Sequence, residues 1–114
     1  ENIATPSITH KEGYDFSSLR ISTMTLDQYT LSHSKPALIK LDVEGAEIAA
    51  LKGARLLIAS DSPPAWIIEI HDPQDESEIL SLLAPGGYLI EKLSKPGKKH
   101  DHFPVHIVAS HHEN

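Results

Sequence analysis

Hydrophobic and polar residues follow clear periods from residue 37 onward, and these periods predict an order of strands and helices. Residues 37–43 and 65–71 are rich in Ile, Leu, Val and Trp, which predicts two strands. Between them, residues 45–60 predict one helix, because apolar side chains recur at steps of three and four: Ile48, Leu51, Ala54 and Ile58. Gly53 interrupts this stripe at a cost of about 1 kcal/mol relative to Ala, which indicates close packing or a local break.

The rest of the chain predicts another helix and two more strands. Asp72 followed by Pro73 is typical of an N-cap and a first helical residue. The buried face of that helix is expected to consist of Ile79, Leu80, Leu82 and Leu83. Residues 88–93 and 105–109 predict strands with no helix between them, so we expect an antiparallel hairpin. Upstream, residues 1–24 are irregular with at most an edge strand around 18–23, and Thr25 with Gln28 predicts a capping box that begins a short helix.

The order strand, helix, strand, helix, strand, strand predicts an α/β fold. Two strands joined by a helix of this length form a parallel crossover, so we expect parallel strands followed by an antiparallel hairpin in one mixed sheet. No internal repeat or shift of composition marks a boundary. Residues 1–114 are therefore interpreted as a single domain.

Charged residues interrupt the two central strands at matching places. Lys40 and Asp42 alternate with apolar residues in the first strand, and Glu69 and His71 do so near the end of the second. Open α/β sheets bind ligands at the carboxyl ends of their strands, and buried charges are costly without partners. We therefore expect these four side chains to line one face of the sheet. A buried structural ion pair between Lys40 and Glu69 is an equally supported interpretation.

Glu44 and Glu47 follow the first strand at the start of the predicted helix. The simpler interpretation is that both favour the helix dipole and that Asp42 caps the helix. The alternative is that these carboxylates contact a ligand.

Composition and charge narrow the classes of function. A chain of 114 residues with a net charge of −6 supports one modest domain and argues against nucleic acid as a partner. No apolar run approaches the roughly 20 residues of a membrane span, and we expect a cytoplasmic protein. The absence of cysteine excludes thiolate chemistry and disulfides. No metal site is expected, because the spacing of the late histidines matches no familiar one: His100, His102, His106, His111 and His112.

Residues 40–47, Lys-Leu-Asp-Val-Glu-Gly-Ala-Glu, resemble the octet of the FkbM family of methyltransferases. The resemblance extends over about residues 21–109. It is carried further by an upstream triplet, a Leu-x-Gly-Ala segment, an acidic strand end and a Gly-Tyr pair: Thr25-Leu26-Asp27, residues 51–54, Glu69 and Gly87-Tyr88.

The resemblance implies a Rossmann-like class I methyltransferase domain that binds S-adenosylmethionine and methylates a hydroxyl of a sugar or small natural product. In such a domain the present residues are strands four to seven, and the family's earlier strands, with the glycine-containing loop that cradles the cofactor, do not occur in this sequence. We therefore interpret the chain as a partial domain. Alone, it is expected to be inactive, and to self-associate through the exposed edge of residues 38–43.

The resemblance also implies roles for individual residues. Asp42 and Glu44 are expected near the amino group of the cofactor's methionine, and Lys40, Glu44 and Glu47 near the substrate. Methyl transfer requires alignment of the acceptor oxygen and removal of its proton. The candidate bases are, in order of preference, Asp42, Glu69 and His71.

Two other readings of the pattern are open. Carboxylates that end consecutive strands also suit a (β/α)8 barrel that binds a metal, although the terminal hairpin counts against it. A non-catalytic interaction module that binds a partner through its open side is the other alternative.

Overall fold

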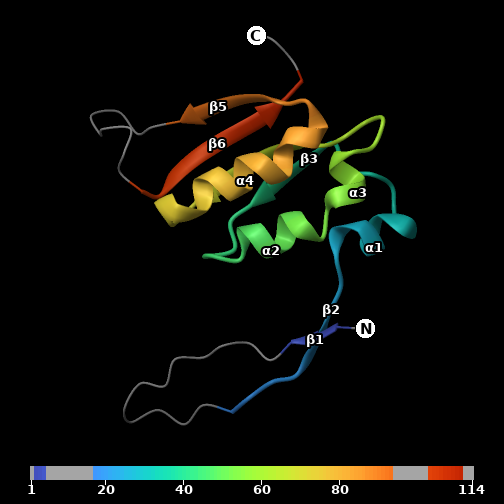
Figure 1. The fold of residues 1–114 in the computed structure, drawn as a ribbon. Helices are drawn as coiled ribbons and strands as arrows, with labels where there is room; N and C mark the ends of the chain where they lie inside the picture. Colours follow the sequence, from blue (N-terminus) through green and yellow to red (C-terminus); the bar gives the residue numbers. More distant parts are fainter. Residues whose placement is uncertain (1, 5–16, 94–102, 112–114) are drawn as a thin grey trace.

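A four-stranded sheet with helices on one face forms the main body of the computed structural model, which describes residues 2–4, 17–93 and 103–111 (Figure 1). Its strands are β3 (Leu38–Leu41), β4 (Ala65–Ile70), β5 (Leu89–Leu93) and β6 (Val105–Ser110). A separate antiparallel pair consists of β1 (Asn2–Ala4) and β2 (Ile21–Thr23). Strand β2 lies within the segment in which an edge strand was expected.

The strand order in the main sheet is β3-β4-β6-β5. Strands β3 and β4 are parallel, with Leu38 opposite Ala65, and β6 is antiparallel to both of its neighbours. Because β4 and β5 both oppose β6, they run in the same direction, as the predicted crossover requires. The mixed α/β sheet and the antiparallel hairpin are confirmed. The (β/α)8-barrel alternative is wrong for the described residues, because an antiparallel strand lies inside this open sheet.

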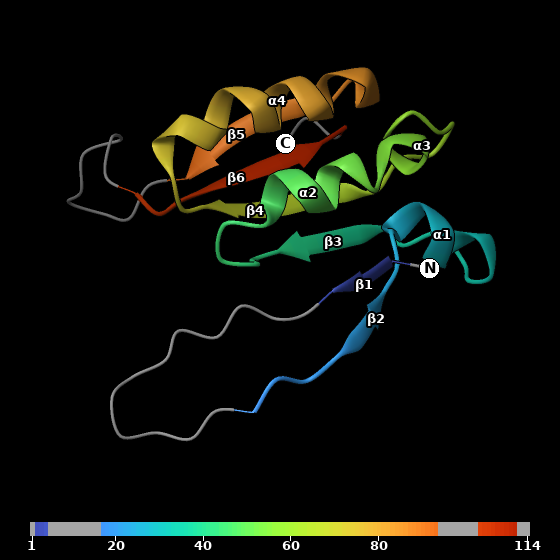
Figure 2. The same cartoon turned by 60° about the horizontal axis from the view of Figure 1, so that its bottom comes forward.

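The helices are α1 (Leu26–Leu31), α2 (Glu47–Lys52), α3 (Arg55–Ile58) and α4 (Glu76–Leu83), with short 3-10 turns η1 (Pro73–Asp75) and η2 (Ala84–Gly86). Figure 2 shows α2 and α4 side by side over the same face of the sheet. The predicted capping box begins α1: Thr25 Oγ1 accepts from the Gln28 N–H and Gln28 Oε1 accepts from the Thr25 N–H, each at 3.0 Å. The predicted N-cap, Asp72, accepts from the Gln74 N–H at 2.9 Å.

The single helix expected over residues 45–60 is two helices, broken at Gly53. A Cβ on Gly53 would lie 3.0 Å from the Cβ of Thr25, so the break is also a close contact with the start of α1. The carboxylate of Asp27 accepts from the N–H groups of Leu56 and Leu57, at 3.1 and 3.0 Å. The upstream triplet and the Leu-x-Gly-Ala segment are therefore in direct contact, and Asp27 replaces the cap that α3 lacks in its own sequence.

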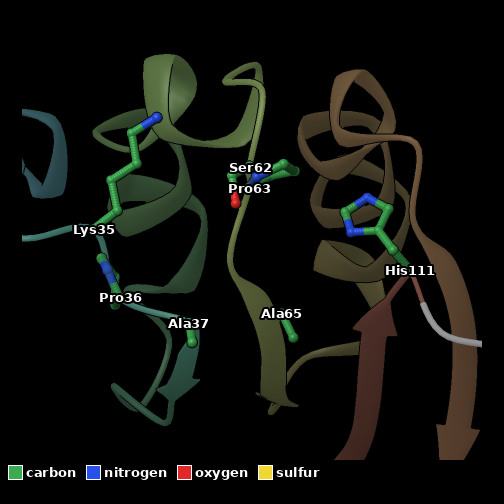
Figure 3. A pocket seen from close by; sticks show the side chains of 7 residues that line it. All are labelled: Lys35, Pro36, Ala37, Ser62, Pro63, Ala65 and His111. Atoms are coloured by element: carbon green, nitrogen blue, oxygen red, sulfur yellow. The ribbon is translucent and has the colours of Figure 1, made fainter.

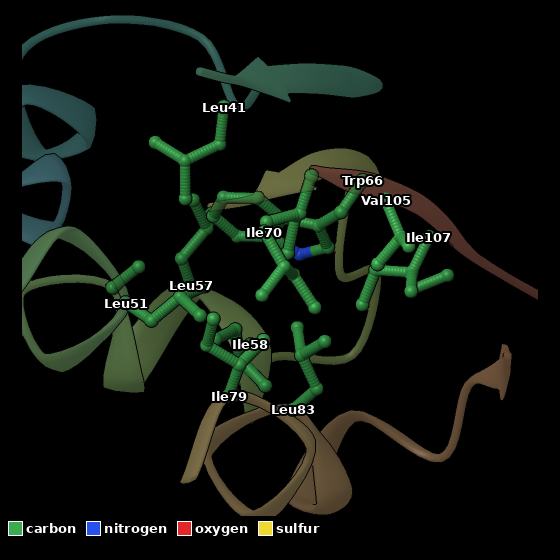
Figure 4. Packing of buried hydrophobic residues seen from close by; sticks show 13 residues of the cluster. Leu41, Leu51, Leu57, Ile58, Trp66, Ile70, Ile79, Leu83, Val105 and Ile107 are labelled. Carbon is green, nitrogen blue, oxygen red and sulfur yellow. The ribbon is translucent and has the colours of Figure 1, made fainter. Parts of the chain in front are cut away.

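The core lies between the helices and the covered face of the sheet (Figure 4). Every second residue of β4 and β6 is buried there: Trp66, Ile68, Ile70, Val105, Ile107 and Ala109. The helices contribute residues that include Leu51, Ile58, Ile79 and Leu83. At the edge of this core the Trp66 indole N–H donates to Tyr88 Oη at 2.9 Å, and that hydroxyl donates to the Pro64 carbonyl at 2.6 Å. Burial raises the pKa of the Tyr88 hydroxyl.

No described helix covers the other face, which we call the open face. It carries the alternate residues of the strands, among them Lys40, Ile67, Glu69, His106 and Val108. None of the helices in the described ranges has both the length and the apolar character required to cross a membrane.

Candidate functional site

The carboxyl ends of β3 and β4 bring three of the predicted site residues together. Asp42 follows β3, Glu69 lies on β4, and His71 follows the end of β4. The Nε2 atom of His71 is 3.4 Å from Asp42 Oδ1 and 3.9 Å from Glu69 Oε1. The convergence that alternation and parallel pairing predicted is present in the structure, because the ends of parallel neighbours meet at one edge of the sheet.

Glu47, the first residue of α2, reaches the same histidine from the helix side. It is 2% exposed and is the only buried charged side chain among the described residues. Its Oε2 accepts from the Gly45 N–H at 2.8 Å, and its Oε1 is 2.6 Å from His71 Nδ1. Sequence reasoning placed Glu47 beside the substrate, but both of its oxygens face protein partners. The geometry therefore favours contact with His71.

A tight turn over residues 43–46 shapes the approach of Glu47. The Ala46 N–H donates to the Val43 carbonyl at 3.2 Å, and the two central residues have positive φ angles, 51° at Glu44 and 100° at Gly45. A left-handed conformation costs a residue other than glycine about 1–2 kcal/mol, so Glu44 stores strain at the site. The N-cap of α2 is Ala46, without a side-chain bond, so the prediction that Asp42 caps the helix is wrong.

The charges around His71 alter its protonation. The hydrogen bond to Glu47 raises the pKa of His71 above 6.5, partial burial of the ring opposes this, and the charges of Glu47, Glu69 and Asp42 raise it further. All three carboxylates therefore favour the imidazolium form.

The predicted buried ion pair between Lys40 and Glu69 is wrong. Lys40 lies on the open face and is exposed, and among the described residues no ion pair joins it to Glu69. Because no described helix covers this face, the lysine stays in solvent and needs no buried partner. Glu69 Oε2 instead lies 3.7 Å from Nε2 of His106, the residue opposite it on β6. Sequence reasoning missed His106 as a neighbour of the site, because only the register of β6 reveals it.

Asp42, Glu69 and His71 are the described residues best placed to hold a cation, since one ligand atom of each lies within 4.8 Å of the others. Exposed carboxylates commonly gather in this way without an ion. Of the late histidines, His111 Nε2 is bonded to the Gly86 carbonyl at 2.6 Å. Three others, His100, His102 and His112, lie outside the described residues.

A hollow of about 340 Å³ lies at the opposite ends of the same two strands (Figure 3). It is lined by Lys35, Pro36, Ala37, Ser62, Pro63, Ala65 and His111. In Figure 3 Lys35 and His111 stand on either side of residues 62–63. Its lining includes no carboxylate side chain, whereas carboxylates and an imidazole converge at the carboxyl ends of the same strands.

The family model for the Methyltransferase FkbM domain matches residues 1–93. The chain belongs to this family. The matched residues contain Asp42, Glu47, Glu69 and His71, so the site lies within the part of the chain that the family shares, and the protein is a methyltransferase by family. Strand β6, with His106, lies beyond the match. No curated protein and no solved structure matches the chain.

Proposed function

We propose that the domain to which this chain belongs transfers a methyl group from S-adenosylmethionine to a hydroxyl of a sugar or small natural product. The observation that carries the proposal is the convergence of Asp42, Glu69 and His71 within the FkbM-matched residues. O-methylation requires a group that accepts the hydroxyl proton and groups that hold the acceptor in line. The carboxylates and the imidazole at the carboxyl ends of β3 and β4 can accept a proton and can hold an acceptor hydroxyl.

The charges at this edge also fit one end of the cofactor. S-adenosylmethionine carries an ammonium and a sulfonium, and carboxylates form strong charge-assisted bonds with an ammonium. Asp42, with a side chain 41% exposed, and the exposed Glu44 would hold that ammonium. When bound, the cofactor supplies an electrophilic methyl group.

We propose that the adenosine part is held by other residues of the complete domain, in which this sheet corresponds to strands four to seven of a Rossmann-like class I methyltransferase. The sequence of this chain contains no glycine-rich motif of the kind that binds a dinucleotide or a phosphate. Two exposed charged residues, Lys40 and Glu44, are proposed to contact the acceptor as well.

A methyl-transfer assay tests the proposal. The complete protein is incubated with cofactor carrying an isotopically labelled methyl group and a panel of sugars and hydroxylated small molecules, and labelled products are detected by mass spectrometry. Asp42→Asn is expected to lower kcat/KM by about 10²-fold, because it removes the carboxylate charge that would hold the ammonium of the cofactor and that lies 3.4 Å from His71 Nε2. Glu91→Gln, an exposed change on β5, is the matched control and should leave turnover unchanged. Absence of label on any hydroxyl, or normal turnover of Asp42→Asn, contradicts the proposal.

A further inference from the structure

Glu47 is a charge kept inside the protein beside an open site. A carboxylate that is 2% exposed is costly unless each oxygen is bonded, and here the two bonds are to the Gly45 N–H and to His71. The bond to His71 is short, 2.6 Å between Oε1 and Nδ1. Because Glu47 is buried and both of its oxygens face protein partners, its influence on chemistry passes through the histidine.

The hydrogen-bonding capacity of these groups fixes the state of the ring. The Gly45 N–H can only donate, so it occupies one oxygen of Glu47, and an ionised carboxylate can only accept, so Nδ1 must carry the hydrogen of the other bond. In the neutral imidazole this leaves the lone pair on Nε2. We propose that Glu47 is a positioning residue that holds His71 in this tautomer, so that Nε2 is the base for the acceptor hydroxyl; this deepens the proposed function and rests on it.

No charged side chain of the described residues forms a close hydrogen bond with Nε2 of His71. Asp42 Oδ1, after β3, is 3.4 Å away and Glu69 Oε1, on β4, is 3.9 Å away. Both distances exceed the roughly 3.2 Å limit of a good N–H···O bond. His106, on β6, faces the other oxygen of Glu69 at 3.7 Å. The side chain of His71 is 25% exposed, and no described acidic side chain bonds closely to Nε2, so the proposal gives an acceptor hydroxyl access to this nitrogen.

The proton and electron balance is simple. As the acceptor oxygen forms its bond to the methyl carbon, the carbon–sulfur bond breaks with its electron pair left on sulfur, and the hydroxyl proton moves to Nε2. The resulting imidazolium is stabilised by Glu47, Asp42 and Glu69, and it then loses its proton to water. The proposal thus places His71 ahead of Asp42, the first-ranked base of the sequence-based prediction, because His71 is bonded to a buried partner.

The first test needs neither cofactor nor acceptor. The full chain is labelled with ¹⁵N-histidine and titrated until the His71 ring is neutral, which requires a pH above its raised pKa, and the tautomer is then determined from two-bond ¹H–¹⁵N correlations. His71→Gln assigns the signals by their disappearance. The expected result is hydrogen on Nδ1. Hydrogen on Nε2 in the wild-type chain overturns the proposal, whatever becomes of the methyl-transfer assay.

The Glu47→Gln variant sharpens this test. The amide oxygen must accept from the Gly45 N–H, so the amide NH₂ faces Nδ1 and forces the hydrogen onto Nε2. Glu78→Gln, which removes an exposed carboxylate 3.6 Å from Lys52, is the control and should keep the wild-type tautomer. A Glu47→Gln chain that folds and keeps hydrogen on Nδ1 contradicts a positioning role.

In the complete protein, Glu47→Gln should lower kcat by about 10²- to 10⁴-fold, the range that a positioned general base contributes, because the base is left in the wrong tautomer. KM for the cofactor should change little, and Glu78→Gln should match the wild type. A flipped tautomer with unchanged kcat would overturn the role of Nε2 as base. If no labelled product forms with the wild type while the tautomer is as expected, the proposed function fails and the positioning of His71 by Glu47 stands.

Discussion

The two faces of strand β4 differ in what they do for the molecule. On the covered face Trp66, Ile68 and Ile70 are each 0% exposed and pack against the helices. On the open face, one residue out of step, Ile67 and Glu69 are half-buried, and His71 follows at the strand end. Along the six residues of β4, side chains that stabilise the core therefore alternate with side chains that face the site. The comparison teaches that a charged residue in a strand indicates a site when it alternates with the buried apolar residues and lies near the carboxyl end of the strand.

The largest expected effect contrasts the two faces directly. Trp66→Ala should lower the free energy of unfolding by about 3–5 kcal/mol, since it leaves a cavity in the core. Ile67→Ala, the neighbouring change on the open face, should cost about 1 kcal/mol, because its side chain already meets solvent. Urea titrations followed by circular dichroism measure both. Equal losses would show that the open face is covered in solution.

The hydroxyl that links the core to the strand ends should matter next. Tyr88→Phe removes the acceptor for the Trp66 indole N–H and the donor to the Pro64 carbonyl. A loss of about 1–3 kcal/mol is expected, because a buried donor is left unpaired. Tyr29→Phe is the control: Tyr29 lies on α1, and its exposed ring stacks on His33. Its free energy of unfolding should stay within about 0.5 kcal/mol of the wild type. A Tyr88→Phe chain of wild-type stability would mean that water replaces the hydroxyl.

The turn at the site gives a smaller effect with an internal control. Gly45→Ala should destabilise the fold by about 1–2 kcal/mol, because φ is 100° there although no atom would contact the new Cβ within 4 Å. Glu44→Gly should change stability by no more than about 0.5 kcal/mol, since relief of strain at φ 51° is offset by the flexibility of glycine in the unfolded chain. The same urea titrations compare the two, and equal losses would refute this turn geometry.

The smallest expected effect is a pH dependence of stability that arises at His71. Its pKa is raised in the folded chain, chiefly by the bond to Glu47. The folded state therefore holds the proton more tightly, and this stabilisation is fully present below the unfolded pKa of about 6.5 and is lost as pH rises through the folded pKa. The urea midpoint should fall over that window. His71→Gln should abolish this part of the slope, whereas His33→Gln should retain it.

Alternation explains why much of the fold and part of the site were predictable. Side-chain parity along residues 65–71 assigns Trp66 and Glu69 to opposite faces without any knowledge of the neighbouring strands. The convergence of Asp42 with His71 follows because parallel strands end at the same edge. Both predictions depend only on local pattern and on the helix between the strands.

The remaining features depend on contacts that sequence spacing does not encode. Glu47 and His71 are 24 residues apart, and their bond depends on how the turn at Gly45 aims α2. A glutamate in a first helical turn has an ordinary explanation in the helix dipole, so its sequence position carried no further signal. The exposure of Lys40 depends on whether anything covers the second face, and the place of His106 depends on the register of β6.

The insertion of β6 between β4 and β5 has a consequence for biosynthesis. Strand β5 is made before β6, yet β6 is its only partner in the described sheet. During translation, β5 therefore emerges from the ribosome with neither edge paired, and it can join the sheet only after residues 105–110 have been added. The residues that seal the core, Val105, Ile107 and Ala109, arrive in the same late segment. Closure of this domain is thus timed by the synthesis of its last described strand, and a nascent chain stalled before that point exposes a strand edge to other chains.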